Sequence, residues 1–189
     1  MGLQQGRVNG GRMARVHILG ASGSGTSTLG VSLARHLACS HVDADSLFWM
    51  PTDPPFTTLR PREDRQTLLL RLLPASGQWI FSGSATDWAG ALEPFFDLVV
   101  FLTLDRSQRM ERLRRREYER HGSRIDRGGD MADASAAFLA WANAYDTAGL
   151  EQRSLATHNA WLSTQRAPVL RLDSSTPVQE LIVAVLVQL

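Results

Sequence analysis

The stretch GASGSGTST, residues 20–28, follows a short apolar run and decides how the rest of the chain is interpreted. A phosphate-binding loop has the pattern Gly, four residues of any kind, Gly, Lys, then Ser or Thr. Gly20, Gly25 and Ser27 fit this pattern, but Thr26 stands where the pattern has lysine. The chain contains twenty arginines and no lysine. Only an arginine, a metal ion or a partner could therefore supply the missing positive charge.

The loop has other means of binding an anion. Its glycines allow a close approach of the backbone, its N–H groups can point inward, and a following helix would add its positive N-terminal end. We therefore predict a phosphate site in which Ser27 also ligates Mg²⁺. The alternative is a glycine-rich turn that only joins a strand to a helix. The candidate binding residues are Gly20, Ser22, Gly23, Ser24, Gly25, Thr26, Ser27 and Thr28.

Apolar runs and helical periodicity alternate along the chain, which predicts an α/β fold with a five-stranded parallel sheet covered by helices on both faces. After the loop, leucines recur every four residues at 29, 33 and 37 and indicate a helix. Thr176 and Gln179 have the spacing of a capping box, with Pro177 at the first position of a C-terminal helix. The expected strands are residues 15–20, 41–45, 79–84, 98–104 and 168–173, and further helices are expected at 62–73, 106–121, from 130 or 133 to 148, and 150–165.

Length and composition indicate one domain, since 189 residues with 43% apolar content can bury a substantial core. We expect a disordered Gly-rich tail over residues 1–14, a single domain with the phosphate-binding loop over 15–189 and a small Arg-rich lid near 112–130. A net charge of +1 gives no reason to expect nucleic acid or a membrane as partner. A single cysteine, Cys39, and the lack of a long apolar run favour a cytoplasmic protein. The oligomeric state stays open.

Two acidic residues stand where the second predicted strand ends. Asp43 and Asp45 would lie at the carboxyl edge of the sheet, where open sheets bind ligands. Asp43 is the candidate for holding Mg²⁺, and Asp45 is the candidate base that accepts a proton from a substrate hydroxyl. The alternative is that both are ordinary turn residues.

Arginines are concentrated in the predicted helix 106–121 and the glycine-containing loop that follows it. Arg109, Arg112, Arg116 and Arg120 recur at helical spacing, and Arg124 and Arg127 follow. A guanidinium can bind two phosphate oxygens at once, so we predict that one or two of the arginines other than Arg109 close on the phosphates and take over part of the lysine's role. The candidates for catalysis are Arg116, Arg120 and Arg124. Alternatively, these arginines form a solvated face with paired glutamates.

Three other stretches predict contacts with a ligand. At the end of the third strand, four residues are candidates for binding an acceptor substrate: Ser82, Ser84, Asp87 and Trp88. Trp49 and Phe56 flank a Pro-rich turn and would either stack on a ring or pack in the core. Residues 173–176, after the last strand, lie where a nucleotide base could rest on the backbone.

Taken together, residues 15–189 resemble the adenylate, shikimate and gluconate kinase group of small-molecule kinases. The resemblance rests on the loop at 20–27, on Asp43 and Asp45, and on the arginine-rich lid. It implies ATP and Mg²⁺ as the donor, a small-molecule acceptor, Ser27 on the metal and lid arginines on the transferred phosphate. Two alternatives stay open: a nucleotide sensor without catalysis, favoured by Thr26, and a sulfotransferase-like protein, to whose loops GSGTS is similar.

Overall fold

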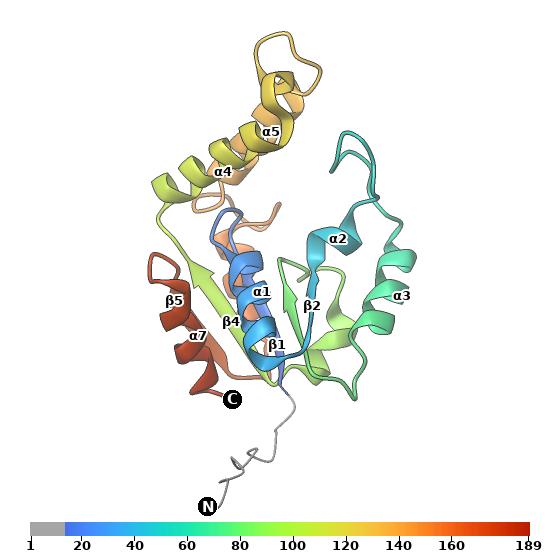
Figure 1. The fold of residues 1–189 in the computed structure, drawn as a ribbon, viewed down its shortest axis with the longest axis vertical. Helices are drawn as coiled ribbons and strands as arrows, with labels where there is room; N and C mark the ends of the chain where they lie inside the picture. Colours follow the sequence, from blue (N-terminus) through green and yellow to red (C-terminus); the bar gives the residue numbers. More distant parts are fainter. Residues whose placement is uncertain (1–13) are drawn as a thin grey trace, which may run out of the picture.

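Five parallel strands in the order β2-β3-β1-β4-β5 form the centre of the structure, a computed structural model that describes residues 14–189 (Figure 1). The strands are β1 (Arg15–Gly20), β2 (Ser40–Asp43), β3 (Trp79–Ser82), β4 (Leu98–Thr103) and β5 (Val169–Asp173). All four neighbouring pairs are parallel, which confirms the predicted sheet. The expected tail lies outside the described residues except for Ala14, which is buried.

The helices follow the predicted order, but several bounds differ, and the helix expected to reach residue 148 ends at Asn143. They are α1 (Thr26–Leu37), α2 (Ala44–Phe48), α3 (Arg62–Leu72), α4 (Arg106–His121), α5 (Ala132–Asn143), α6 (Leu155–Leu162) and α7 (Val178–Leu186), with short 3₁₀ turns η1 (Gly90–Phe95) and η2 (Gly122–Ile125). The short α2 was not expected. The helix expected at 150–165 begins only after Ser154, because Ser154 and Thr157 form a reciprocal capping box. The capping box predicted at Thr176 is wrong, since Pro177 itself precedes α7 and no side chain caps that helix.

The two faces of the sheet bury separate apolar layers. Because side chains alternate along a strand, Val16 and Ile18 of β1 pack with Leu29 of α1 and Val185 of α7, whereas Leu19 faces the other layer. That second layer is formed by residues from β3, β4, α3, η1 and α6: Phe81, Val99, Phe101, Leu69, Leu92 and Leu162. Each fully buried side chain of this kind contributes about 1.5–3 kcal/mol. The loop between β1 and α1 is thus mounted on a rigid support.

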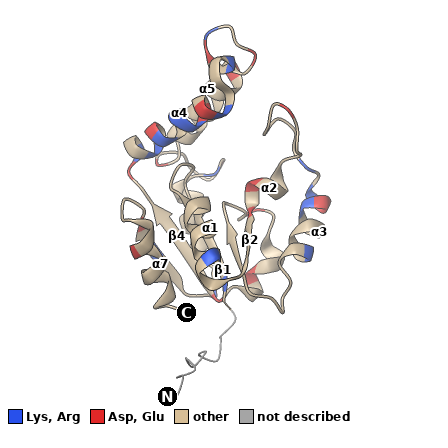
Figure 2. Cartoon of the chain, in the orientation of Figure 1, with Lys and Arg blue, Asp and Glu red and all other residues tan. Residues whose placement is uncertain are grey.

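Helices α4 and α5 with η2 extend beyond the carboxyl ends of the strands (Figure 1). Met110 and Leu113 of α4 pack against Ala142 and Phe138 of α5, so the two helices form one unit. Figure 2 shows several basic residues, coloured blue, along α4. Within residues 14–189, no helix is both long enough and apolar enough to cross a membrane.

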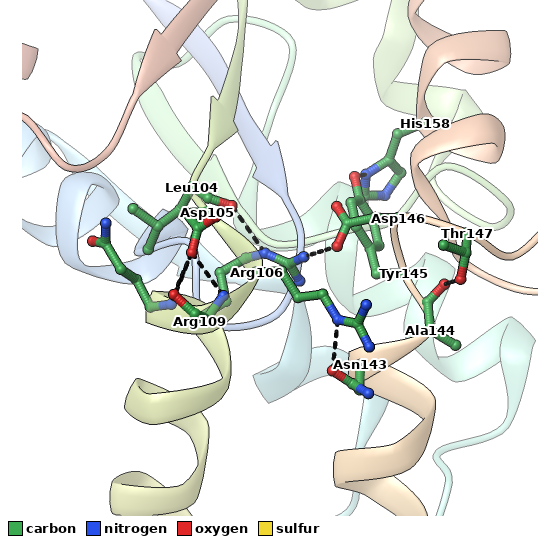
Figure 3. Close-up of polar contacts among 12 residues, drawn as sticks. Leu104, Asp105, Arg106, Arg109, Asn143, Ala144, Tyr145, Asp146, Thr147 and His158 are labelled. Carbon is green, nitrogen blue, oxygen red and sulfur yellow. Dashed lines mark hydrogen bonds and ion pairs between the residues drawn. The ribbon is translucent and has the colours of Figure 1, made fainter.

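Arg109 anchors the base of this unit (Figure 3). Its side chain is buried, its Nε donates to the Leu104 carbonyl oxygen at 3.1 Å, and its guanidinium pairs with Asp146. The guanidinium also lies 5.1 Å from the centre of the Tyr145 ring. One side chain thereby ties α4 to the end of β4 and to the segment that follows α5.

Candidate functional site

At two positions of the loop between β1 and α1, the surrounding backbone leaves room only for glycine. A Cβ at Gly20 would lie 2.5 Å from the Leu102 carbonyl oxygen of the neighbouring strand, so only glycine fits there. Gly23 has φ = +83°, and a Cβ on it would lie 2.8 Å from the Arg109 carbonyl oxygen. Close packing against both β4 and α4 therefore explains why small residues dominate the loop.

The N-terminus of α1 is open to a ligand. Gly25 caps the helix with φ = +90° and offers no side-chain acceptor, and the first turn contains no acidic residue. The first backbone N–H groups of a helix have no partner within it, and they attract anions. Thr26, Ser27 and Thr28 form this first turn, and Thr26 brings no charge to it. Of the loop residues that the sequence singled out, Gly25 to Thr28 lie at this helix end, and the others lead from β1 to it.

Ser27 and Asp43 lie in direct contact. The Ser27 Oγ donates to Asp43 Oδ2 at 2.5 Å, and the Ser82 Oγ donates to the same oxygen at 3.0 Å. The other carboxylate oxygen, Oδ1, accepts from the Asp45 backbone N–H at 3.0 Å and caps α2. Hydroxyl and carboxylate oxygens are ligands that Mg²⁺ accepts, and this ion usually takes only one or two carboxylates from a protein. The pair fits the Mg²⁺ that the fold implies.

Asp45 is placed differently from what the sequence predicted. The strand ends at Asp43, and Asp45 stands in the first turn of α2, because Asp43 caps that helix. The Asp45 side chain reaches solvent at a pocket, but protein atoms crowd around it. This desolvation, followed by the nearby charge of Asp43, raises the pKa of Asp45, while Arg153, Arg116 and Arg120 act to lower it. A carboxylate with a raised pKa is suited to accept a proton.

A first cleft of about 620 Å³ opens beside the loop. One wall is the loop and the first turn of α1, and a second is α4 with Arg112 and Arg116. The third wall comes from the segment after β5, where Ser174, Ser175 and Thr176 lie. This is the segment in which we expected a nucleotide base to rest.

A second pocket of about 870 Å³ lies on the other side of the loop. Two aromatic groups line it from opposite sides: Phe48, Trp49, Phe56 and Trp88 on one, and Phe138 and Trp141 of α5 on the other. Polar groups in the lining include Ser22, Asp45, Ser84, Asp87, Arg116, Arg120 and Arg153. Arg116 lines both cavities, so the two meet along the loop and α4.

The candidate arginines of α4 and η2 have separate surroundings. Arg116 is exposed to both cavities. Arg120 lines the second pocket, lies 4.2 Å from the centre of the Phe56 ring and approaches Glu117 at 3.4 Å. Arg124 pairs with Asp130 at 2.6 Å and with Asp53 at 3.6 Å, and it is not among the residues that line either cavity. The structure thus brings Arg116 and Arg120 to the two cavities and leaves Arg124 outside both, in η2.

Two polar residues of the site region were missed from the sequence. Arg153, just before α6, donates to Ser22 Oγ at 3.0 Å. His158 of α6 is buried and contacts Ser84 Oγ at 2.9 Å and Tyr145 Oη at 2.8 Å. Both come from the region after α5, which carries no recognisable motif. They reach the site because the chain turns back after α5 and α6 packs against the sheet near the loop.

Similar proteins support this description of the fold. Residues 16–134 match the family described as AAA domain. An uncharacterised protein of Bacillus subtilis, YqaC, is 42% identical over 165 residues, which cover 87% of this chain and 91% of the relative.

Solved structures show the same arrangement at low sequence identity. A shikimate kinase from Bacteroides thetaiotaomicron is 18% identical with a TM-score of 0.54, covering 94% of this chain and all (100%) of the kinase. A gluconokinase from Sinorhizobium meliloti is 16% identical with a TM-score of 0.51, covering 93% of this chain and 91% of the kinase. The chain therefore belongs to the AAA domain family and has the fold of the P-loop small-molecule kinases.

Proposed function

We propose that this protein is an ATP-dependent phosphotransferase that acts on a small molecule. The observation that supports this most is the pair of cavities that meet at one loop. The first cleft combines an open helix N-terminus with the Ser27 and Asp43 pair, which suits a nucleotide and its Mg²⁺. The second pocket combines aromatic walls with Asp45 and arginines, which suits a small acceptor.

In this proposal the residues divide the chemistry between them. The backbone N–H groups of the loop hold the phosphates, and Ser27 with Asp43 would hold Mg²⁺, which neutralises charge on the transferring group when it is bound. Asp45 accepts the proton of the acceptor hydroxyl, and its raised pKa makes it a stronger base than an ordinary aspartate. Arg116, which lines both cavities, stabilises the charge that develops between donor and acceptor.

Thr26 supports a second candidate function, a sensor that binds the nucleotide without turnover. The residue stands in the first turn of α1, where the loop pattern has its lysine, and carries no charge. Removing one preorganised donor costs about a hundred- to a thousandfold in rate in other enzymes. Such a loss could leave binding without useful catalysis.

One experiment separates the two candidates. Thermal unfolding is measured with ATP, with ADP and with small hydroxylated or phosphorylated acceptors, each with and without Mg²⁺, and the same mixtures are assayed for ADP formation. The phosphotransferase proposal expects stabilisation by ATP with Mg²⁺ and by one acceptor class, with ADP formed only when both are present and lost in Asp45→Asn. Stabilisation by ATP with no ADP formed from any acceptor would support the sensor instead.

A further inference from the structure

We infer that Arg153 supplies the positive charge that the phosphate-binding loop lacks, by contacting the terminal phosphate of the nucleotide. This inference rests on the proposed nucleotide site. It differs from the sequence-based prediction, which assigned this role to arginines of α4 and the loop after it.

Arg153 contacts the loop at Ser22, four residues before Thr26. Its Nη2 donates to the Oγ of Ser22, the third residue of the loop, at 3.0 Å. Ser22 lines the second pocket, while residues 23–29 line the first cleft. Arg153 itself lines the second pocket, so its guanidinium lies on the acceptor side of the loop, next to the residues that line the first cleft.

The backbone around Arg153 is held in place. Ser154, its neighbour, caps α6 through Thr157 and donates its Oγ to the Gly149 carbonyl oxygen at 2.6 Å. The guanidinium also lies 4.5 Å from the centre of the Trp141 ring. A cation fixed in this way loses little conformational entropy when it binds an anion, unlike the exposed side chains of α4.

The charge of Arg153 is poorly compensated. Within residues 14–189, no carboxylate lies at ion-pair distance from its guanidinium, and its one hydrogen bond goes to a neutral hydroxyl. Burial lowers the pKa of Arg153, and Asp45, followed by Tyr145 and Asp87, opposes that shift from beyond ion-pair distance. Partly buried charges are normally paired, so this guanidinium has capacity for an anionic ligand.

Arg116 lines both cavities, but among residues 14–189 it makes no hydrogen bond to the loop, and the other arginines of α4 and η2 have different contacts. Arg112 directs its Nη1 to the Gly23 carbonyl oxygen at 3.5 Å and lines only the first cleft. Arg120 and Arg124 have the aromatic and acidic partners described above. Arg153 is the cation whose contact with the loop lies on the acceptor side.

The test measures the affinities of ATP and ADP with Mg²⁺ by calorimetry in the parent protein and in Arg153→Gln. Because ADP lacks the terminal phosphate, loss of the proposed contact weakens ATP by about ten- to a hundredfold and leaves ADP almost unchanged. Adding Thr26→Lys to Arg153→Gln restores the preference for ATP. Arg106→Gln is the matched control, since Arg106 donates to the neutral Asn143 at 2.8 Å outside both cavities and should leave both affinities unchanged.

Three outcomes would overturn the inference: equal loss of ATP and ADP affinity in Arg153→Gln, no loss of either, or no preference for ATP in the parent. Arg153→Lys keeps the charge, so it should retain more of the ATP preference than Arg153→Gln, and it decides the matter if Arg153→Gln fails to fold. The proposed function is judged separately, by ADP formation in the parent. An ATP preference that depends on Arg153, without turnover, would uphold the inference and refute the phosphotransferase.

Discussion

Replacing Arg109 by methionine should destabilise the protein strongly, because this side chain ties α4 to the rest of the structure. Methionine keeps much of the apolar stem but loses the hydrogen bond to the Leu104 carbonyl oxygen, the pair with Asp146 and the contact with the Tyr145 ring. A hydrogen bond from a charged group contributes about 1.5–3 kcal/mol and a cation–π contact about 0.5–1 kcal/mol. The side chain of Asp146 is 36% exposed and regains water, so its pair adds little to the loss.

These contributions predict a loss of about 3 kcal/mol in the free energy of unfolding, or a fall of about 6–12 °C in Tm for a chain of this size. Urea unfolding followed by circular dichroism measures the free energy directly. Arg106→Gln is the control, because Arg106 is exposed and its removal should cost less than about 0.5 kcal/mol. A loss below about 1 kcal/mol in Arg109→Met would refute the anchoring role.

Three further predictions follow from the loop, the Asp43 contacts and the buried histidines. Gly23→Ala should lower the free energy of unfolding by about 1–3 kcal/mol and weaken ATP binding, because the positive φ of Gly23 and the Arg109 carbonyl oxygen at 2.8 Å exclude a Cβ. Gly90→Ala is the control, since its Cβ would meet nothing closer than 3.9 Å. Calorimetry and urea unfolding should find this control close to neutral. Asp43→Asn should reduce the Mg²⁺-dependent part of ATP affinity about tenfold. The amide keeps only one acceptor oxygen, whereas the carboxylate accepts from Ser27, Ser82 and the Asp45 N–H. The exposed control Asp64→Asn should have no such effect, and calorimetry that finds the same affinity in Asp43→Asn as in the parent would exclude Asp43 from the metal site. Burial lowers the pKa of His17 to about 3 and of His158 to about 4, so both stay neutral in the folded protein while the unfolded chain binds protons near pH 6.5, and stability should fall by about 1.5–2 kcal/mol per histidine as the pH drops from 7 to 5. Urea unfolding of His158→Gln should show about half of the total fall that the two histidines cause in the parent, and a fall equal to the parent's would contradict the assignment to His158.

The sheet and the loop could be predicted from the sequence because local patterns determine them. The apolar runs of β1 and β4 are buried on both faces, and the glycines at 20 and 23 meet backbone at distances that exclude any side chain. The placement of residues 174–176 beside the loop also follows from strand order, because β5 lies next to β4 and β4 next to β1.

The rest of the site depends on contacts between distant segments. The sequence could not show that the strand ends before Asp45, because the helix that Asp43 caps is too short to show periodicity. Arg153 and His158 reach the site only because α6 packs against one face of the sheet, and no local pattern marks either residue. Among the arginines, spacing placed Arg116 and Arg120 on one helix, but it could not show that Arg124 is paired with Asp130 and Asp53.

The most direct test of a working nucleotide site is calorimetry of ATP with the parent protein, with and without Mg²⁺, beside the Ser27→Ala variant. We predict saturable binding of one ATP per chain that strengthens with Mg²⁺, and a Ser27→Ala variant that binds ATP with no response to Mg²⁺, because Ser27 and Asp43 provide the contacting oxygens. Absence of ATP binding to the parent at millimolar concentration, or an unchanged response to Mg²⁺ in Ser27→Ala, would contradict the proposed site.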